Sequence, residues 1–466
     1  MKLKVLALTL VIGYFTTMCS STDTIDQPIE IPNTNEKDSI ETPGEPSSET
    51  PLETSFYTNG EKLDIGNGKK TLVLTGEENE NDSNTLNAEI DRMSSSDSEK
   101  GGEITLTKVP GKPYIYLSNI VLKNNIHIKI ASDVIIRPWF SPTRQKNVPI
   151  FEMGMETKIN NVAITCVNED SKDPNDYFNV ELTGGAEERV TMLFAQRVTN
   201  FKVSGIKFFD SNTIFSNLEF NLDKDQSRKE GDISNNGVVK NMVSLNNHVG
   251  YGLIQARAAK HVLFKNLDGQ GGVTLRLETG FLPAINSKDM TLDQIVGRDI
   301  IIRDGDAAVM LSPHRVTQGH VDISGIEAYN ATYAAQIDGG FIDDKGGVDN
   351  LGTFNTTSSI RNFKKIEGGT NAQVKLKDYP LYPCPDQEKF DNTAHNIDDE
   401  SKKGASLTVV RYGASPLSGC VTIFGNKPTG CYEIELDLPS DDKVNGTVLG
   451  LDKKVVYPAA DKINCN

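Results

Sequence analysis

After its first residues the sequence has no apolar run long enough to cross a bilayer as a helix, which argues against a body built from membrane-spanning helices. Long amphipathic helical patterns are also scarce, and the one candidate covers residues 85–93. Hairpin dipeptides are few, which disfavours a β-sandwich or a propeller. The 466 residues therefore predict a fold of many short strands joined in another way.

The N-terminus has the three regions of an export signal. Two lysines precede an apolar run over residues 5–15, and small and polar residues follow it. Cys19, followed by serines and an aspartate, indicates a bacterial lipoprotein whose cysteine carries the lipid, although Met18 is irregular before such a site. We expect a signal peptide over residues 1–18 and a secreted protein or an outer-membrane, cell-surface lipoprotein.

Residues 19–55 predict a disordered, acidic linker. They are rich in Pro, Ser, Thr and Glu and nearly lack aromatic residues, so they cannot bury enough apolar surface to fold. Nine acidic residues against one lysine give this linker half of the chain's net charge of −16. The folded body is therefore much less acidic than the whole chain, and an anionic substrate is not excluded.

Cysteines gather near the C-terminus. Disulfides are expected there in an exported protein, but four cysteines allow three connectivities and the sequence does not choose between them: Cys384, Cys420, Cys431 and Cys465. Cys166 stands alone in a strand-like segment, and we interpret it as a buried core thiol.

Short strand patterns repeat along the middle of the chain. The segments 201–206, 239–243, 261–267 and 320–326 have apolar residues at alternate positions, and a second short strand follows each about a dozen residues later. Such repetition predicts a solenoid whose coils bury one another's apolar faces. We expect an all-β, right-handed parallel β-helix of the pectin-lyase-like type.

The domain boundaries follow from this pattern. The helix at residues 85–93 would cap the open first coil. We expect the β-helix body over residues 56–345. An insertion or small subdomain is expected over 346–405, where the repeat of strand patterns is interrupted. The last coils and a C-terminal cap are expected over 406–466.

Three polar residues recur at coil spacing. Gln255 and His314 each precede a repeated His-Val pair by six residues, so we expect them at the same place in their coils. Glu278 follows Gln255 by 23 residues, one plausible coil. Adjacent coils are roughly 4.8 Å apart, so the three would form a line of about 10 Å.

Charged and apolar residues alternate around the central member of this line. In Leu275-Arg276-Leu277-Glu278 the two charged side chains should face outward together. The extra residues between Glu278 and His314 predict a loop over 281–293 that walls a groove. A carboxyl, an imidazole, an amide and a guanidinium on one face are typical of a catalytic site.

This region resembles the active site of the iota-carrageenases, glycoside hydrolase family 82. In that family a Gln on one coil is followed by Arg-x-Glu-x-Asp on the next and by a His on a later coil. The resemblance implies endo-acting, inverting hydrolysis of β-1,4 bonds in the sulfated galactan iota-carrageenan. Glu278 would be the general acid, Arg276 would bind a substrate sulfate, and Gln255 and His314 would assist.

One position departs from the family pattern, because Gly280 stands where the second carboxylate is expected. A carboxylate from another coil could replace it, with Asp338 as first choice, about 10 Å from Glu278, and Asp306 as second. Alternatively, His314 holds or activates the water, or the protein has lost hydrolysis and only binds glycans.

Other charged residues are secondary candidates. Arg257, Arg303 and Arg315 would suit sulfate esters if they lie near the groove, because a guanidinium offers a fork of donors. Asp304-Gly305-Asp306 resembles a fragment of a calcium loop without the remaining ligand spacing, so we predict no metal site. No cofactor is expected to be required, and a structural calcium or other ion stays open.

Three hypotheses remain. The first is an iota-carrageenase-like hydrolase for carrageenan catabolism, in which burial raises the pKa of Glu278 toward neutrality. The second is a polysaccharide lyase on an anionic glycan, and the third is a non-catalytic surface glycan-binding lipoprotein. In each case the expected partner is a sulfated or otherwise anionic polysaccharide, with no nucleic acid, membrane contact only through Cys19, and a monomeric state.

Overall fold

The computed structural model describes residues 52–58, 67–140, 149–182, 189–220, 233–279, 290–342, 351–390, 401–419 and 430–465. The expected signal peptide, Cys19, most of the linker, Gly280, residues 281–289 of the expected loop, and Cys420 lie outside these residues. No helix in the described ranges is long and apolar enough to span a membrane.

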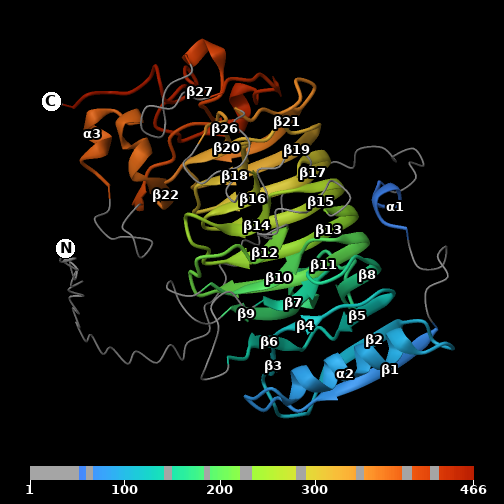
Figure 1. Ribbon diagram of the computed structural model, residues 1–466. Helices are drawn as coiled ribbons and strands as arrows, with labels where there is room; N and C mark the ends of the chain where they lie inside the picture. Colours follow the sequence, from blue (N-terminus) through green and yellow to red (C-terminus); the bar gives the residue numbers. More distant parts are fainter. Residues whose placement is uncertain are drawn as a thin grey trace, which may run out of the picture. The chain divides into compact units, whose positions relative to one another are not determined.

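Nearly all described strands belong to two parallel sheets that share the same coils (Figure 1). The larger sheet, here called sheet A, contains β1 Gly68–Leu74, β2 Gly102–Lys108, β3 Ile115–Leu117, β5 Ile126–Ile130, β6 Ile135–Pro138, β8 Ile159–Cys166, β9 Phe178–Leu182, β11 Val198–Asp210, β13 Ser234–Leu245, β15 Ala259–Gln270, β17 Leu292–Arg303, β19 Val321–Tyr329, β21 Ser359–Glu367, β25 Glu435–Leu436 and β26 Val444–Asn445.

The second sheet, here called sheet B, contains β4 Ile120–Val121, β7 Pro149–Met153, β10 Thr191–Ala195, β12 Leu218–Phe220, β14 Gly252–Ala256, β16 Val273–Glu278, β18 Ala307–Ser312, β20 Tyr333–Ile337, β24 Val410–Tyr412 and β27 Val455–Val456. Along the chain, strands of sheets A and B alternate from β10 to β21, and every ladder within the two sheets is parallel. The predicted parallel β-helix is thus confirmed.

A helix closes the first coils, as predicted. Helix α2 spans Asn81–Ser95 and turns Leu86, Ile90 and Met93, spaced for one helical face, into the core. It contacts β1, β3 and β4, so it covers apolar edges that an open coil would leave in water. Figure 1 shows it lying across the blue end of the stack.

Asparagines bend the chain at the corners of the coils. Asn161, Asn200 and Asn236 stack at equivalent positions with φ of 55°, 57° and 54°, a left-handed conformation that Asn tolerates better than most residues. The Asn200 amide donates to Asn161 Oδ1 over 2.9 Å, and the Asn266 amide donates to Asn241 Oδ1 over the same distance at a second corner. These ladders set the corners, so outward residues on successive coils stay in register.

The interior is filled by aligned apolar side chains. Phe201, Phe220 and Phe264 are fully buried, and neighbouring rings stand 5.8 and 5.9 Å apart. Burying such a side chain contributes about 1.5–3 kcal/mol, and each coil repeats the contribution. The alternation seen in the sequence therefore reports a real division between a core face and an outer face.

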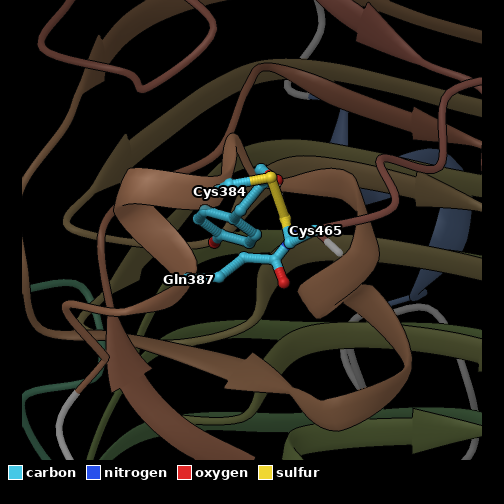
Figure 2. The surroundings of a disulfide bond; sticks show 4 residues. Cys384, Gln387 and Cys465 are labelled. Atoms are coloured by element: carbon cyan, nitrogen blue, oxygen red, sulfur yellow. Dashed lines mark hydrogen bonds between the residues drawn. A yellow bond between two sulfur atoms is a disulfide. The ribbon is translucent and has the colours of Figure 1, made fainter.

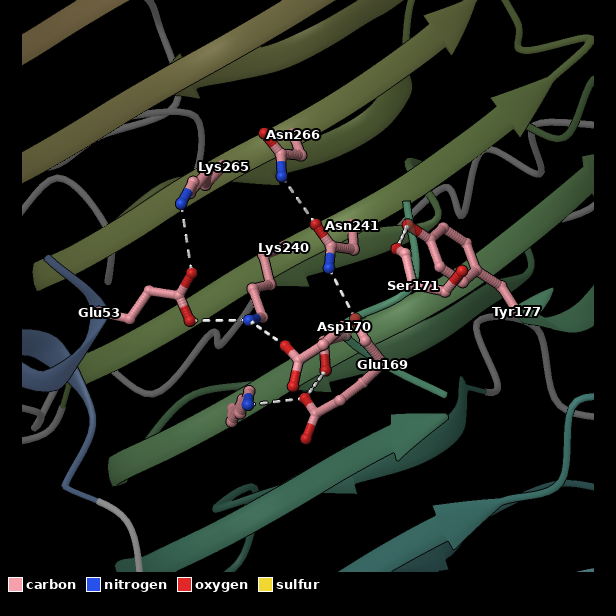
Figure 3. Close-up of polar contacts among 11 residues, drawn as sticks. Glu53, Glu169, Asp170, Ser171, Tyr177, Lys240, Asn241, Lys265 and Asn266 are labelled. Atoms are coloured by element: carbon pink, nitrogen blue, oxygen red, sulfur yellow. Dashed lines mark hydrogen bonds and ion pairs between the residues drawn. The ribbon is translucent and has the colours of Figure 1, made fainter. Parts of the chain in front are cut away.

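A short segment before the first strand crosses the outer face of sheet A. Helix α1 spans Glu53–Phe56, so the end of the range expected to be a disordered linker is folded onto the body. Glu53 forms ion pairs with Lys240 (2.7 Å) and Lys265 (3.3 Å), and the Phe56 ring stacks on His261. Figure 3 shows Glu53 reaching both lysines, with Asp170 on the other side of Lys240.

The expected insertion is narrower than predicted. β21 lies inside the range 346–405 but pairs with β19 as a further coil, with one register shift, and its Ile360, Phe363 and Ile366 are buried in the core. The departure from the coils begins after β21 and contains β22 Ala372–Lys375, η4 Leu376–Leu381, α3 Cys384–Gln387 and β23 Ser401–Gly404, with β22 and β23 antiparallel. The remaining 3-10 helices are η2 Pro174–Asp176, η5 Pro416–Ser418 and η6 Asp441–Lys443.

This subdomain covers part of the outer face of sheet B. Its Val374, Tyr382 and Phe390 share an apolar cluster with Met310 and Tyr333 of the sheet. Met310 is the register partner of Arg276. The subdomain is therefore positioned next to the predicted catalytic row.

One of the predicted C-terminal disulfides lies within the described residues. Cys384 of α3 is bonded to Cys465, with a Cα–Cα distance of 5.4 Å, which ties the subdomain to the C-terminal segment (Figure 2). Cys166 is buried and has a free thiol, as predicted, and burial raises its pKa. It is therefore a structural side chain rather than a reactive one.

Removing this disulfide should destabilise the fold. The bond closes a loop with a sequence separation of 81, and its absence leaves the unfolded chain more freedom. We expect the pair Cys384→Ser and Cys465→Ser to lower the free energy of unfolding by about 2–4 kcal/mol in urea titrations. Cys166→Ala is the control for loss of a thiol, and equal urea midpoints for the paired variant and wild type would contradict the expectation.

Candidate active site

Glu278 ends strand β16 on the outer face of sheet B. Leu275 and Leu277 are fully buried in the core, which turns Arg276 and Glu278 to the other side. Arg276 Nε lies 2.7 Å from Glu278 Oε2, so the predicted common orientation of the two is confirmed. The outer face is covered here, because Glu278 is only 7% exposed.

Both oxygens of Glu278 have close polar neighbours. The Gln255 amide nitrogen donates to Oε2 over 2.6 Å, and His314 Nε2 lies 3.0 Å from Oε1. Because an ionised carboxylate only accepts, His314 Nε2 must carry the proton. The structure therefore brings together the four residues that carry the motif: Gln255, Arg276, Glu278 and His314.

The predicted coil positions of two of these residues are wrong. Gln255 pairs in register with Arg276, which in turn pairs with Met310, so His314 lies four residues beyond the equivalent position. The turn between β18 and β19 is longer than the turn between β14 and β15, and counting back from the following strand therefore misplaces His314. His314 reaches Glu278 from this turn, in a left-handed conformation with φ of 47°.

The expected raised pKa of Glu278 is also wrong for this structure. Burial raises the pKa, but Arg276 and the His314 hydrogen bond outweigh burial, so the pKa lies well below the ordinary value. Glu278 is thus an ionised carboxylate here. Engaging one of these neighbours elsewhere would raise the pKa again.

The remaining arginines have different environments. Arg257 bridges Gln255 Oε1 (2.9 Å) and Glu219 Oε2 (2.7 Å) and is buried. Arg315 is buried, with 2% of its surface exposed. Arg303 ends β17 in sheet A, pairs with Asp268 over 3.0 Å and lies over the Tyr329 ring, so the expectation that it lines the same groove is wrong.

The two alternative carboxylates differ in their distance from Glu278. Ser312 is the register partner of Glu278, and Asp338 is the next residue in the same outward row, two coil spacings or about 10 Å away. Asp306 hydrogen-bonds through its backbone to Gly272, six residues before Glu278, or about 20 Å along the strand. Asp306 is therefore too distant to act with Glu278.

Both carboxylates are paired with cations. Asp338 contacts Arg411, and although burial raises its pKa, Arg411 and Lys377 lower it below the usual value. Asp306 forms an ion pair with Lys375 over 2.6 Å. Among the described residues no group of three or more His, Cys, Asp or Glu side chains is arranged to hold a metal.

Sequence reasoning missed one buried carboxylate of this site. Glu219 is the register partner of Gln255 on the preceding coil and is fully buried. Its neighbours Leu218 and Phe220 point into the core, so the alternation in Leu-Glu-Phe could have shown that it faces outward, in the row of Gln255 and Arg276. The short strand lacks a conspicuous motif, which is why it was not singled out.

The fold and these contacts define a right-handed parallel β-helix with a buried carboxylate site on the outer face of one sheet. No protein-family model matches the chain. The chain is similar in sequence to proteins named iota-carrageenase, in agreement with the resemblance predicted from the motif. It is 35% identical over 309 residues to the iota-carrageenase of Zobellia galactanivorans, covering 64% of this chain and 60% of that protein.

A second curated protein agrees with this similarity, and a solved structure agrees with the fold. The iota-carrageenase of Alteromonas macleodii is 28% identical over 301 residues, covering 64% of this chain and 58% of that protein. The chain thus spans about three fifths of the length of the curated relatives it matches. A solved iota-carrageenase complexed to iota-carrageenan fragments has the same fold, with a TM-score of 0.69, 21% identity, and coverage of 90% of this chain and 98% of that one.

Proposed function

We propose that this protein is an endo-acting, inverting glycoside hydrolase that cleaves β-1,4 linkages of iota-carrageenan. The observation that carries the proposal is the convergence of Gln255, Arg276 and His314 on the two oxygens of Glu278. The similarity to proteins named iota-carrageenase supports the substrate class. The reaction needs only side chains and water, so no cofactor is part of the proposal.

Glu278 is the proposed general acid. It must deliver a proton to the glycosidic oxygen as the bond to the anomeric carbon breaks. In the ligand-free site the Arg276 ion pair opposes protonation. A substrate sulfate that takes over the Arg276 guanidinium would weaken this ion pair, so Glu278 would gain its proton when substrate is bound.

Asp338 is the proposed base. It would remove a proton from the water that attacks the opposite face of the sugar. Its separation from Glu278, about 10 Å by coil spacing, lies just above the range of roughly 6.5–9.5 Å between the carboxyl groups of inverting pairs. Arg411 keeps it ionised, as a base must be. Water activation by His314 is less well supported, because its Nε2 is already bonded to Glu278.

We also propose that the protein is exported, anchored through Cys19 or free, and monomeric. The apolar run over residues 5–15 and the cysteine that follows support export and anchoring. The acidic stretch after Cys19 would serve as a spacer up to α1.

The test is an incubation of the purified full chain with iota-, kappa- and lambda-carrageenan and alginate. Reducing ends and absorbance near 235 nm are followed together. Reducing ends from iota-carrageenan without new absorbance are expected. An increase in absorbance near 235 nm would assign the protein to the lyases. No product from any of the substrates would favour a glycan-binding protein.

The role of Arg276 predicts a defined pH effect. Arg276→Met removes the cation that lowers the pKa of Glu278, so this pKa should rise. Because the acid must be protonated, the limb on which activity falls with increasing pH should move to higher pH. Loss of the sulfate contact should also lower kcat/KM by about 10–100-fold, since a charge-assisted bond contributes roughly 1.5–3 kcal/mol.

The measurement is kcat/KM on iota-carrageenan as a function of pH. Arg298→Met, which removes an arginine from the outer face of sheet A, is the matched control and should leave the profile unchanged. If the alkaline limb of the pH profile of Arg276→Met lies at the same pH as in wild type, the proposed control of the Glu278 pKa by Arg276 is wrong.

A further inference from the structure

Glu219 and Arg257 form a buried ion pair beside the catalytic row. Glu219 is fully buried, and it accepts from Arg257 over 2.7 Å and from the Ser216 backbone N–H over 3.1 Å. Burial raises the pKa of Glu219, and the Arg257 charge and the Ser216 N–H oppose this effect. Neither side chain contacts Glu278 in the structure, and the proposed reaction assigns neither of them a step.

Arg257 constrains the Gln255 amide. A guanidinium can only donate hydrogen bonds, so the Gln255 atom that faces it must be the oxygen. The amide nitrogen then points the other way and donates to Glu278 Oε2 over 2.6 Å. If the amide were reversed, two donors would meet at Arg257 and two acceptors would meet at Glu278.

The buried Glu219–Arg257 pair contributes little to the free energy of unfolding. A buried ion pair loses the hydration of both charges, and apolar residues of similar size often stabilise a fold as well or better. Its geometric effect is specific, however, because it determines which end of Gln255 reaches Glu278. Glu219 and Arg257, on two neighbouring coils, thus act on the proposed acid Glu278 through one donor, the Gln255 amide nitrogen.

We propose that Glu219 and Arg257 are positioning residues that fix the orientation of the Gln255 amide, so that its nitrogen is directed at Glu278. This inference rests on the proposed function for its effect on catalysis. The effect of Glu219 and Arg257 on the Gln255 amide and on the charge state of Glu278 does not depend on which substrate the protein binds.

The test removes the pair as a unit. The double variant Glu219→Gln, Arg257→Met leaves no unpaired buried charge, and its kcat and KM on iota-carrageenan are compared with wild type in both the native and the Gln255→Ala background. In a protein that keeps Gln255, we expect the double variant to lower kcat about tenfold or more with little change in KM. In the Gln255→Ala protein we expect the double variant to cause no further fall in kcat. The effects of residues that act through one another are not additive. Equal fold-losses in both backgrounds would mean a merely structural role and would overturn the inference.

A second readout needs no activity. The Glu278 carboxyl carbon is followed by ¹³C NMR during a pH titration, with its signal assigned by comparison with Glu278→Gln. Loss of the directed amide donor should raise the pKa of Glu278 in the double variant. An unchanged titration would overturn the inference even if the wild-type protein has no activity on iota-carrageenan, an outcome that would separately reject the proposed function.

The matched control is Asp210→Asn. Asp210 is also a buried carboxylate, held by Thr213 and Asn217, and no contact among the described residues links it to Gln255. Its loss should change the melting temperature without changing the titration of Glu278 or the pH profile. A shift of the same size in this control would attribute the effect to general loosening and would count against the positioning role.

Discussion

Replacing Glu278 by glutamine should reduce kcat on iota-carrageenan by about 10²–10⁴-fold, because a positioned general acid contributes about that factor. Glutamine has nearly the same shape but has no acidic proton to give to the leaving oxygen. Gln255 and His314 would still surround the side chain, but Arg276 would lose its ionic partner, so a loss of stability is expected and activity is expressed per folded molecule. The measurement is reducing-end release at saturating substrate.

The control for this experiment is Asp322→Asn on sheet A. Asp322 is also a carboxylate with two arginine partners, Arg298 at 2.6 Å and Arg361 at 2.8 Å, but it lies on the other sheet. It should retain wild-type activity. A Glu278→Gln protein with more than a tenth of wild-type kcat would show that another group protonates the leaving oxygen.

Asp338→Asn should cause the second large loss, again about 10²–10⁴-fold in kcat, because asparagine cannot take a proton from water. The substitution also leaves Arg411 with only Asp378 as an ionic partner, so a loss of stability is expected. Breaking a buried ion pair costs about 3–5 kcal/mol, and activity must therefore be expressed per folded molecule. Urea titration gives the folded fraction under the assay conditions.

The variant Asp306→Asn separates loss of catalysis from loss of stability. It breaks a buried ion pair of the same kind, with Lys375, but lies about 20 Å along the strand from Glu278. It should lose stability and keep its activity per folded molecule. If Asp338→Asn behaves in the same way, Asp338 is a structural residue and not the base.

Local pattern predicted much of the fold. Alternation in segments such as 201–206 shows that Phe201 and Val203 enter the core, and that rule needs no knowledge of the rest of the chain. The capping helix was predictable for the same reason, since Leu86, Ile90 and Met93 already lie on one helical face. The end of the coils was harder to predict, because β21 resembles its polar surroundings and its place is decided by pairing with β19.

Only part of the site could be read in this way. Arg276 and Glu278 share a face because they are two residues apart on one strand. The register of His314 depends on the length of a turn, and Arg303 lies on sheet A because the coil changes sheets after it. Alternation along its own strand turns Glu219 outward, but its pairing with Gln255 on the neighbouring coil depends on the register between coils.

The sequence by itself determined the alternating strands, the solenoid class, the capping helix and the outward pair Arg276 and Glu278, because each depends on residues close together in the chain. Only the tertiary structure decided how turns of unequal length align the coils, and with them the partners of Gln255, His314 and Asp338. It also decided the charge of Glu278, because a pKa depends on the burial and on the charges that distant segments bring to it.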